Sequence, residues 1–215
     1  MHPVRPAALP PHADLLIEGE RRVWDGRFPL DVVDFRQRRF DGRMSGPRRW
    51  ELWRRGRAAA LLPYDPDADA VALIEQFRLP ALAAGIDPVL VELPAGLCDG
   101  AEAPEQTIAR EAQEETGLAA DRLTRIATVM LSPGGSDELC TLFAGRVRLP
   151  PAGPDGVLGH AGLAAEDEDI RVRRWAAPEA IAAAQDGRFA NGLTMIALLW
   201  LGARRDALRA EWRNR

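Results

Sequence analysis

One stretch decides the fold of this chain: Gly96-Leu97-Cys98-Asp99-Gly100-Ala101-Glu102, followed after a spacer by Arg110-Glu111-Ala112-Gln113-Glu114-Glu115-Thr116-Gly117-Leu118. The spacer Ala103-Pro104-Glu105-Gln106 can open a helix, because a proline in the first turn costs no helical hydrogen bond. A helical repeat predicts the inward face of this helix, made of Ile108, Ala109, Ala112 and Thr116. Gly117 is a natural C-terminal stop.

Glutamates crowd the end of this predicted helix. Glu111 and Glu115 lie one turn apart on one face, and Glu114 is also within one turn of Glu111. Like charges at such offsets destabilise a helix by roughly 0.2–0.5 kcal/mol per pair, and the C-terminal end of the helix dipole favours cations. A bound divalent cation reverses both effects, because carboxylate oxygens are its preferred ligands. The alternative, an acidic face turned to solvent, does not account for the fixed spacing of the glycine, arginine and glutamates.

The same spacing resembles the Nudix box, G-x5-E-x7-R-E-U-x-E-E-x-G-U, in which U is a bulky apolar residue and is here Ala112. The resemblance implies that Glu111 and Glu115 ligate Mg²⁺, with Mn²⁺ as a possible substitute. Glu114 assists them, and the backbone carbonyl of Ala95 completes the ligand set. The resemblance also gives structural roles within the box to Gly96, Glu102, Arg110 and Gly117, with Glu102 and Arg110 forming an ion pair.

A second segment, Leu131-Ser132-Pro133-Gly134-Gly135-Ser136-Asp137-Glu138, follows the box. Within the Nudix family, a proline at this distance from the last box glycine is typical of ADP-ribose pyrophosphatases. A glycine-rich turn exposes backbone N–H groups that can approach a sugar or phosphate closely. A plain turn between two strands is the alternative interpretation.

A third segment, Gly159 to Ile170, combines glycines with four consecutive acids. It resembles the loop that carries the catalytic glutamate in bacterial ADP-ribose pyrophosphatases. By this resemblance Glu166 is the general base and Glu168 is a further metal ligand, and an exchange of these two roles stays open. Flexibility suits a base that must approach only after substrate is bound. Taken alone, the segment reads as a solvated loop.

The resemblance to these enzymes extends from about Leu15 to Trp212 and implies a homodimer whose N-terminal strands help to build the partner's substrate site. From one subunit, the implied adenosine-side residues are Arg27, Phe28, Trp50, Glu51, Ser132, Pro133, Gly134 and Glu138. From the other they are Arg55, Arg78 and Leu97. Trp50 replaces an arginine of closer relatives, and Arg27 stands where an aromatic residue is common, so the resemblance implies rearranged base stacking.

The rest of the chain fits an α+β protein, in which a Nudix αβα sandwich with a mixed sheet follows a small N-terminal antiparallel β-sheet. We expect residues 1–13 to be disordered, 14–55 to form the N-terminal β-sheet dimerisation domain and 56–215 the Nudix hydrolase domain. Alternating or apolar runs predict strands beginning at 15 and covering 30–35, 50–53, 58–63, 71–76, 89–93, 123–131, 139–147 and 170–175. Helices are expected over 178–185 and 192–208, the second turning Leu193, Ile196, Ala197 and Trp200 inward.

Bulk properties narrow the class of protein further. The formal net charge of −4 disfavours a general nucleic-acid binder. Cys98 and Cys140 show neither metal spacing nor a disulfide framework, which favours a reducing compartment. The longest apolar run, 193–203, is too short to span a bilayer, and the N-terminus has no signal pattern. We therefore expect a cytoplasmic protein that binds neither membrane nor nucleic acid.

Taken together, the sequence predicts a metal-dependent pyrophosphohydrolase that cleaves ADP-ribose to AMP and ribose 5-phosphate. Hydrolysis of GDP-mannose or of another nucleoside diphosphate sugar is the alternative within the same enzyme class. A non-catalytic sensor for ADP-ribose-like ligands is the alternative from another class. Retention of Glu111, Glu114 and Glu115 weighs against the sensor, because a protein that only binds has no need of them.

Overall fold

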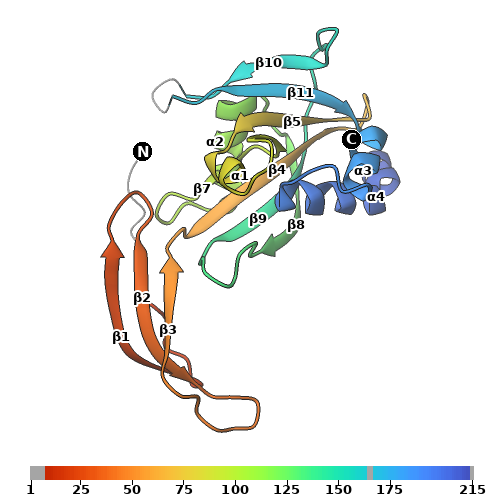
Figure 1. Cartoon of the computed structure of the whole chain (residues 1–215). Coiled ribbons are helices and arrows are strands. Elements are labelled where there is room, and N and C mark those ends of the chain that lie inside the picture. Colours follow the sequence, from red (N-terminus) through yellow and green to blue (C-terminus); the bar gives the residue numbers. More distant parts are fainter. Residues whose placement is uncertain (1–7, 164–166, 214–215) are drawn as a thin grey trace. The chain divides into compact units, whose positions relative to one another are not determined.

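The computed structural model describes residues 8–163 and 167–213 (Figure 1). Its strands are β1 (Leu15–Trp24), β2 (Leu30–Gln37), β3 (Arg48–Trp53), β4 (Arg57–Asp65), β5 (Ala70–Phe77), β6 (Val89–Glu92), β7 (Ala95–Leu97), β8 (Arg122–Val129), β9 (Leu139–Arg146), β10 (Val157–Ala161) and β11 (Ile170–Ala176). Its helices are α1 (Leu79–Ala83), α2 (Pro104–Thr116), α3 (Ala177–Gln185) and α4 (Gly192–Arg213). The sequence did not predict α1, β7 or β10.

The chain divides into two compact units. The first unit contains Met1–Arg57 together with the loop Met130–Leu139, and the second contains Ala58–Val129 and Cys140–Arg215. The loop therefore groups with the N-terminal strands, although it lies within the range 56–215 that the sequence assigned to the hydrolase domain.

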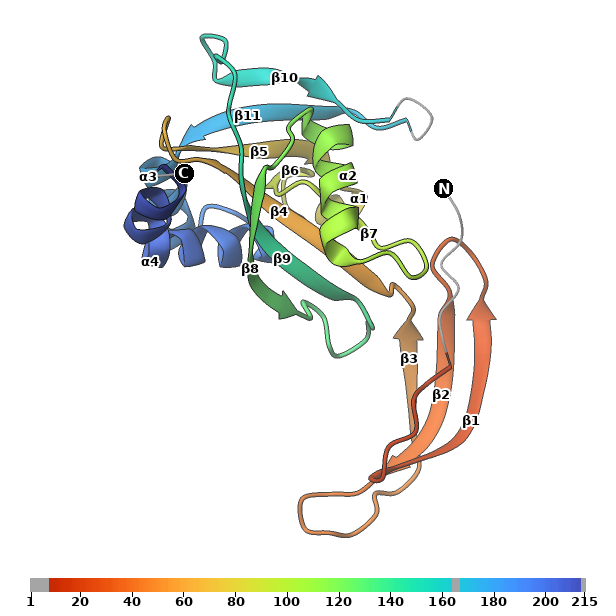
Figure 2. The same cartoon turned by 180° about the vertical axis from the view of Figure 1, so that it is seen from behind.

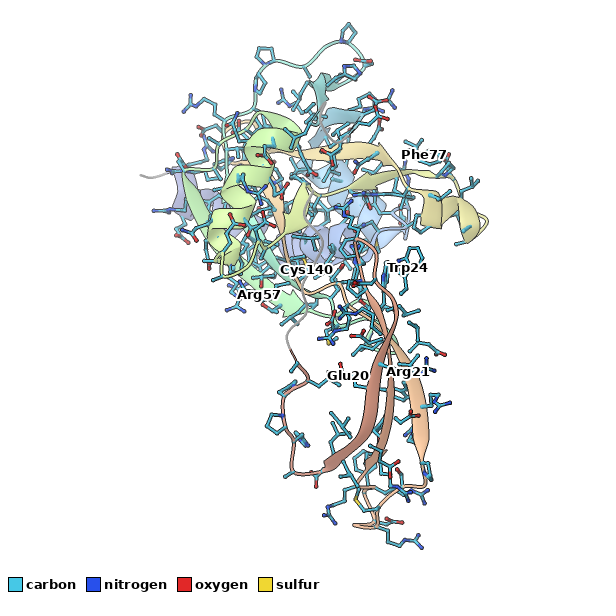
Figure 3. All side chains as sticks on the ribbon, turned by 90° about the vertical axis from the view of Figure 1, so that its left-hand side faces the viewer. Glu20, Arg21, Trp24, Arg57, Phe77 and Cys140 are labelled. Atoms are coloured by element: carbon cyan, nitrogen blue, oxygen red, sulfur yellow. The ribbon has the colours of Figure 1, made fainter. Side chains whose placement is uncertain are left out.

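The first unit is built on the N-terminal sheet, whose strand order is β1-β2-β3. Both strand pairs are antiparallel, with Glu20 opposite Val33 and Val33 opposite Trp50. The Asp41-Gly42 turn between β2 and β3 places Gly42 at φ 83°, a conformation that glycine adopts without steric cost. Glu20 and Arg21 on β1 and Trp24 at its end are labelled in Figure 3.

The second unit is built on a sheet with the order β10-β11-β5-β4-β9-β8. The hairpin of β4 and β5 pairs next to its turn, where Tyr64 lies opposite Val71. Farther from the turn, β5 pairs with β6 and β4 pairs with β7, with Ala60 opposite Ala95. This arrangement fixes the backbone of β7, which precedes the loop into α2.

Helices cover both faces of this sheet (Figure 2). Alternate residues of β4 point to opposite faces: Ala59 and Leu61 pack in a cluster with Ile108 and Ala112 of α2, whereas Leu62 packs in a cluster that includes residues of α3 and α4. The predicted αβα sandwich, preceded by an antiparallel N-terminal sheet, is confirmed.

The inward faces of two helices differ in detail from the sequence prediction. On α2, Ala109 is exposed, and the buried positions are Thr107, Ile108, Ala112 and Glu115. On α4, Ala197 is fully buried, but Leu193, Ile196 and Trp200 are only partly buried against the core. The fully inward positions of α4 are Thr194, Ala197, Leu198, Leu201, Leu208 and Trp212.

Within residues 8–163 and 167–213, no helix combines the length and the apolar character that crossing a bilayer requires.

Candidate active site

Helix α2 carries the glutamates of the box, and its ends form as the sequence predicts. Pro104 occupies the first turn, and the Ala103 amide donates a hydrogen bond to the side-chain oxygen of Gln106 at 3.1 Å. At the other end, Gly117 adopts a left-handed conformation with φ 68°, and its amide donates to the Gln113 carbonyl. The helix is thus fixed at both ends by local chemistry.

Glu115 is the most buried of these glutamates, with 5% of its surface exposed. The Ala95 amide donates a hydrogen bond to its Oε2 at 2.9 Å and joins the helix to β7. Burial and the negative charges of Glu111 and Glu168 raise the pKa of Glu115 to about 8, against the effects of this hydrogen bond and of Arg78. A further positive charge beside Glu115, in addition to that of Arg78, would favour the ionised form of its carboxylate.

Glu111 lies directly against the backbone of Gly96. A Cβ atom at Gly96 would stand 1.9 Å from Oε1 of Glu111, so a residue with a side chain would displace this carboxylate. Burial raises the pKa of Glu111, and the charges of Glu114 and Glu168 raise it further, against the effect of Arg110. The first glycine of the box therefore makes room for a carboxylate of its helix.

Arg110 holds the acids of the box loop and helix together. Its guanidinium lies 3.4 Å from Oε2 of Glu102, 2.9 Å from Glu111 and 3.1 Å from Glu114. Glu102 also accepts hydrogen bonds from the Thr107 hydroxyl at 2.9 Å and from the Asp99 amide at 3.3 Å. The ion pair expected between Glu102 and Arg110 is thus part of a larger network.

Three residues beside this site form a group that sequence reasoning missed in part. Arg78 donates to Oε2 of Glu92 at 2.7 Å, and the side chain of Asn191 donates to Oε1 of the same glutamate at 2.6 Å. Glu92 is buried at the end of β6, and Asn191 directly precedes α4. The isolated acid in the apolar run Val89-Leu90-Val91-Glu92-Leu93 was the available signal for this group. It orients Arg78, whose charge acts on Glu115.

The metal-binding prediction concerns Ala95, Glu111, Glu115 and Glu168. Among the described residues, no three acidic, histidine or cysteine side chains stand close enough together to hold a metal ion as they are placed. The donor chemistry nevertheless fits a hard divalent cation, because the charges of Glu111 and Glu168 disfavour ionisation of Glu115 and a cation would offset them.

The structure describes only part of the acidic segment from Gly159 to Ile170. Glu166, the predicted general base, lies outside the described residues. Glu168 accepts a hydrogen bond from the Leu163 amide at 3.3 Å, and its charge acts on both Glu111 and Glu115. Of the two acids considered for catalysis in this loop, the described one therefore neighbours the box glutamates.

In the first unit, several predicted substrate residues form what we call the arginine–aromatic cluster: Arg27, Phe28, Trp53 and Arg55. The guanidinium of Arg55 lies 4.0 Å from the ring centre of Phe28 and 4.8 Å from that of Trp53, and Arg27 lies 5.0 Å from the Phe28 ring centre. Arg55 also donates to Oε2 of Glu138 at 2.6 Å. The sequence assigned Arg55 to the opposite subunit from Phe28 and Glu138, but here one chain brings all three together.

The remaining predicted substrate residues are placed as follows. Trp50 packs edge-on against Phe35, with Arg48 over its ring at 4.8 Å, and neighbouring Glu51 is exposed. The turn residues Ser132, Pro133 and Gly134 are exposed on the loop of the first unit, whereas Arg78 and Leu97 belong to the second unit.

Comparison with known proteins agrees with this geometry. The family model described as NUDIX domain matches residues 54–195. An ADP-ribose pyrophosphatase of Escherichia coli (strain K12) is 39% identical over 199 residues, covering 93% of each chain. An ADP-ribose pyrophosphatase of Haemophilus influenzae is 36% identical and covers 94% of this chain and 92% of its own length.

Two further comparisons extend these findings. A GDP-mannose pyrophosphatase of Yersinia enterocolitica is 35% identical and covers 80% of this chain and 84% of its own length. A crystal structure of an ADP compounds hydrolase shares the fold with a TM-score of 0.65 at 19% identity, covering 94% of this chain and 98% of that one. The matched domain contains the whole glutamate helix, and the chain therefore belongs to the Nudix family and is a Nudix hydrolase.

Proposed function

We propose that this protein hydrolyses ADP-ribose to AMP and ribose 5-phosphate. The observation that carries the proposal is the placement of Glu111 and Glu115 against Gly96 and Ala95, with the charge of Glu168 acting on both. The two ADP-ribose pyrophosphatases that align along almost the whole chain support this choice of substrate.

The proposed reaction adds water across the diphosphate. Water attacks one phosphorus atom, the bond from that atom to the bridging oxygen breaks, and Glu166 accepts the proton of the water. Nudix hydrolases generally use divalent cations, and we propose Mg²⁺, with Mn²⁺ as a substitute. Glu111, Glu115, Glu168 and the Ala95 carbonyl would hold such cations, which would neutralise charge on the diphosphate and acidify the attacking water. Arg78, held by Glu92, offsets the charge that develops on the phosphate oxygens.

The arginine–aromatic cluster supports a nucleotide sugar as the substrate class. Aromatic rings and guanidinium planes stack on bases, and charged guanidinium groups attract phosphate. We propose that Arg27, Phe28, Trp50, Glu51, Arg55, Ser132, Pro133, Gly134 and Glu138 bind the adenosine side of the substrate, and that Arg78 and Leu97 also bind it.

GDP-mannose is the second candidate substrate, favoured by the Yersinia enterocolitica relative. A panel of ADP-ribose, GDP-mannose and other nucleoside diphosphate sugars, incubated with the protein and Mg²⁺, separates the two candidates. Chromatography should show AMP from ADP-ribose as the fastest-formed product, and a chelator should abolish it. Faster release of GMP from GDP-mannose would assign the second substrate, and release of neither nucleotide would refute both.

We further propose that the protein is a cytoplasmic homodimer that binds no nucleic acid. In the sequence, Cys98 and Cys140 show neither metal spacing nor a disulfide framework, which supports a reducing compartment. The net charge of −4 supports the absence of a nucleic-acid partner. Large apolar side chains exposed on the first unit, among them Leu16, Trp24 and Phe40, support association with a second copy.

A further inference from the structure

Arg54, which directly follows β3, lies at the centre of an ion-pair network that links β1 and β2 of the N-terminal sheet to the loop Met130–Leu139. Its guanidinium contacts Glu20 of β1 at 3.5 Å, Asp31 of β2 at 3.1 Å and Asp137 of the loop at 2.8 Å. Glu20 is labelled on β1 in Figure 3. All of these residues belong to the first compact unit. We call Arg54, Asp31 and Asp137 the Arg54 network.

Two members of the Arg54 network are buried and Asp137 is partly buried, which makes their charges interdependent. Arg54 is 5% exposed and Asp31 is 2% exposed. The second oxygen of Asp31 accepts a hydrogen bond from Arg22 at 2.9 Å, so this carboxylate is held on both sides. A charge in such surroundings is costly unless it is paired and hydrogen-bonded. Removing one member therefore leaves each of its neighbours in the network with one partner fewer.

Asp137 is the member that lies on the loop, and its carboxylate reaches the backbone of the segment that follows β3. Its Oδ1 accepts hydrogen bonds from the amides of Arg55 at 2.6 Å and Gly56 at 3.0 Å, while its Oδ2 accepts from Arg54. Burial acts to raise the pKa of Asp137, but these donors outweigh burial and hold the pKa below its usual value. The ionised carboxylate thus joins the loop to the chain that follows β3.

Backbone hydrogen bonds continue this attachment on both sides of Asp137. The Trp53 amide donates to the Gly135 carbonyl at 2.8 Å, and the Asp137 amide donates to the Trp53 carbonyl at 3.1 Å. The Leu139 amide donates to the Gly56 carbonyl at 2.9 Å. The loop therefore runs alongside residues 53–56 as if it were a further strand.

The position of this loop determines where two of its functional groups lie. Glu138, directly after Asp137, accepts the hydrogen bond of Arg55, and Arg55 in turn stacks on Phe28. On the other side, the turn that begins at Ser132 is closed by hydrogen bonds from the amides of Gly135 and Ser136 to the Ser132 carbonyl. A shift of Asp137 would move both groups relative to the arginine–aromatic cluster.

We propose that Arg54, acting through Asp137, is a positioning residue that sets substrate affinity by fixing the loop Met130–Leu139 beside the arginine–aromatic cluster. The inference rests on the proposed function, because it takes this loop to be part of the nucleotide-sugar site. Neither Arg54 nor Asp137 contacts the substrate in this proposal. Their effect passes through Arg55 and Glu138.

Asp137→Asn is the most direct test, because the side-chain oxygen of asparagine can still accept the amides of Arg55 and Gly56 while the charge facing Arg54 is lost. A charged hydrogen bond of this kind accounts for about a tenfold change in an equilibrium. We expect the KM for ADP-ribose to rise by about tenfold with kcat within about twofold of wild type. Hydrogen exchange at the amides of 135–139 should become faster.

Asp34→Asn is the matched control. It removes the ion pair of Asp34 with Arg49, 2.6 Å long, from the same N-terminal sheet without touching the loop. This variant should keep the KM and the exchange rates of 135–139 at wild-type values. Arg54→Lys keeps the charge but loses the planar guanidinium, so it should raise KM, as Asp137→Asn does. The double variant should raise KM by less than the product of the two single fold-changes, because both substitutions act on one interaction.

The outcomes separate this inference from the proposed function. If wild-type protein hydrolyses ADP-ribose but Asp137→Asn leaves KM unchanged, the positioning role is refuted whether or not exchange accelerates. A fall in kcat and melting temperature at constant KM would likewise refute it, because a smaller folded fraction explains that pattern. If wild-type protein hydrolyses no nucleoside diphosphate sugar, the proposed function fails and this inference fails with it.

Discussion

Glu115 is placed where its negative charge destabilises the fold of the metal-free protein. Its carboxylate is buried on α2, accepts one backbone hydrogen bond, and is subject to the negative charges of Glu111 and Glu168. Because burial and like charge raise its pKa to about 8, ionisation near neutral pH opposes folding of the metal-free protein. Under the proposed function, stability and activity therefore make opposite demands on this residue.

Glu115→Gln should separate these two demands. Glutamine keeps an acceptor for the Ala95 amide but removes the charge, so turnover at saturating Mg²⁺ should fall by more than about 100-fold, beyond the usual loss for a residue that only supports a ligand. In the presence of a chelator, the melting temperature should be equal to or higher than that of wild type. Steady-state kinetics and thermal denaturation measure the two effects.

The same substitution on the same helix provides a control. Glu105 lies in the first turn of α2 and is exposed, so Glu105→Gln should leave turnover within about twofold of wild type, as expected for a surface substitution. Wild-type turnover in Glu115→Gln would show that the box glutamates do not bind the catalytic metal.

Glu166 and Glu168 should respond differently to loss of charge. Glu166→Gln should lower kcat by roughly 10²–10⁴-fold while substrate still binds, which is the usual effect of losing a general base. Glu168→Gln should act mainly by raising the Mg²⁺ concentration required for half-maximal rate, because its charge acts on Glu111 and Glu115. Titrations of Mg²⁺ at fixed ADP-ribose distinguish the two. A loss of less than tenfold in Glu166→Gln, with the large loss in Glu168→Gln, would reverse the assignment.

At the scale of elements, Asp69 joins the β4–β5 turn to α4. It adopts φ 50°, accepts a hydrogen bond from the Tyr64 hydroxyl at 2.9 Å, and is ion-paired with Arg205. Its carbonyl also accepts the Ala177 amide at the start of α3. The hydrogen bond from Arg205 is the main cause of the lowered pKa of Asp69, and burial acts against it.

Asp69→Asn should destabilise the protein in a pH-dependent manner. Asparagine tolerates the left-handed backbone, so the substitution removes the charge without adding backbone strain. The pKa of Asp69 is lower in the folded state than its unfolded value of about 3.9. The contribution of Asp69 to the free energy of unfolding is therefore complete above about pH 3.9, and it is lost as the pH falls through the folded pKa.

Urea denaturation should therefore show a loss of about 1–2 kcal/mol at pH 7 for Asp69→Asn. The difference from wild type should shrink as the pH falls below about 3.9. Asp67, whose pair with Arg213 is largely exposed, provides the control, since Asp67→Asn should cost at most about 0.5 kcal/mol at pH 7. An equal loss for Asp69→Asn at pH 7 and in strong acid would contradict this explanation.

At the scale of the whole molecule, the N-terminal sheet leads us to expect a homodimer. Trp24 is 65% exposed and Phe40 is fully exposed, which is unfavourable for large apolar side chains that remain in water. Light scattering at micromolar concentration should give about twice the chain mass of 23.6 kDa. Replacing Trp24 and Phe40 by serine should weaken the dimer, whereas replacing the exposed Arg39 by serine should not. A fully active wild-type monomer at that concentration would contradict the proposed assembly.

The sequence by itself determined the class of fold and the helix that carries the box glutamates. The helical repeat, Pro104 and Gly117 act over a few residues, and the glutamate spacing fixes which side chains share a face of α2. Most strands were also predictable, because β4 and β5 are long apolar runs. By contrast, β7 is too short to show a period, and Ala109 was misplaced because a short apolar residue on α2 need not face the core.

Only the tertiary structure decided which distant residues meet. Glu92 and Asn191 are 99 positions apart, and Arg54 and Asp137 are 83 positions apart, yet both pairs are hydrogen-bonded. No local period or turn signal links such residues, because their contact depends on strand pairing and on the path of the intervening chain through the fold. The sequence therefore supplied the glutamates of the box helix, and the fold supplied the partners that hold Arg78 and the loop Met130–Leu139 in place.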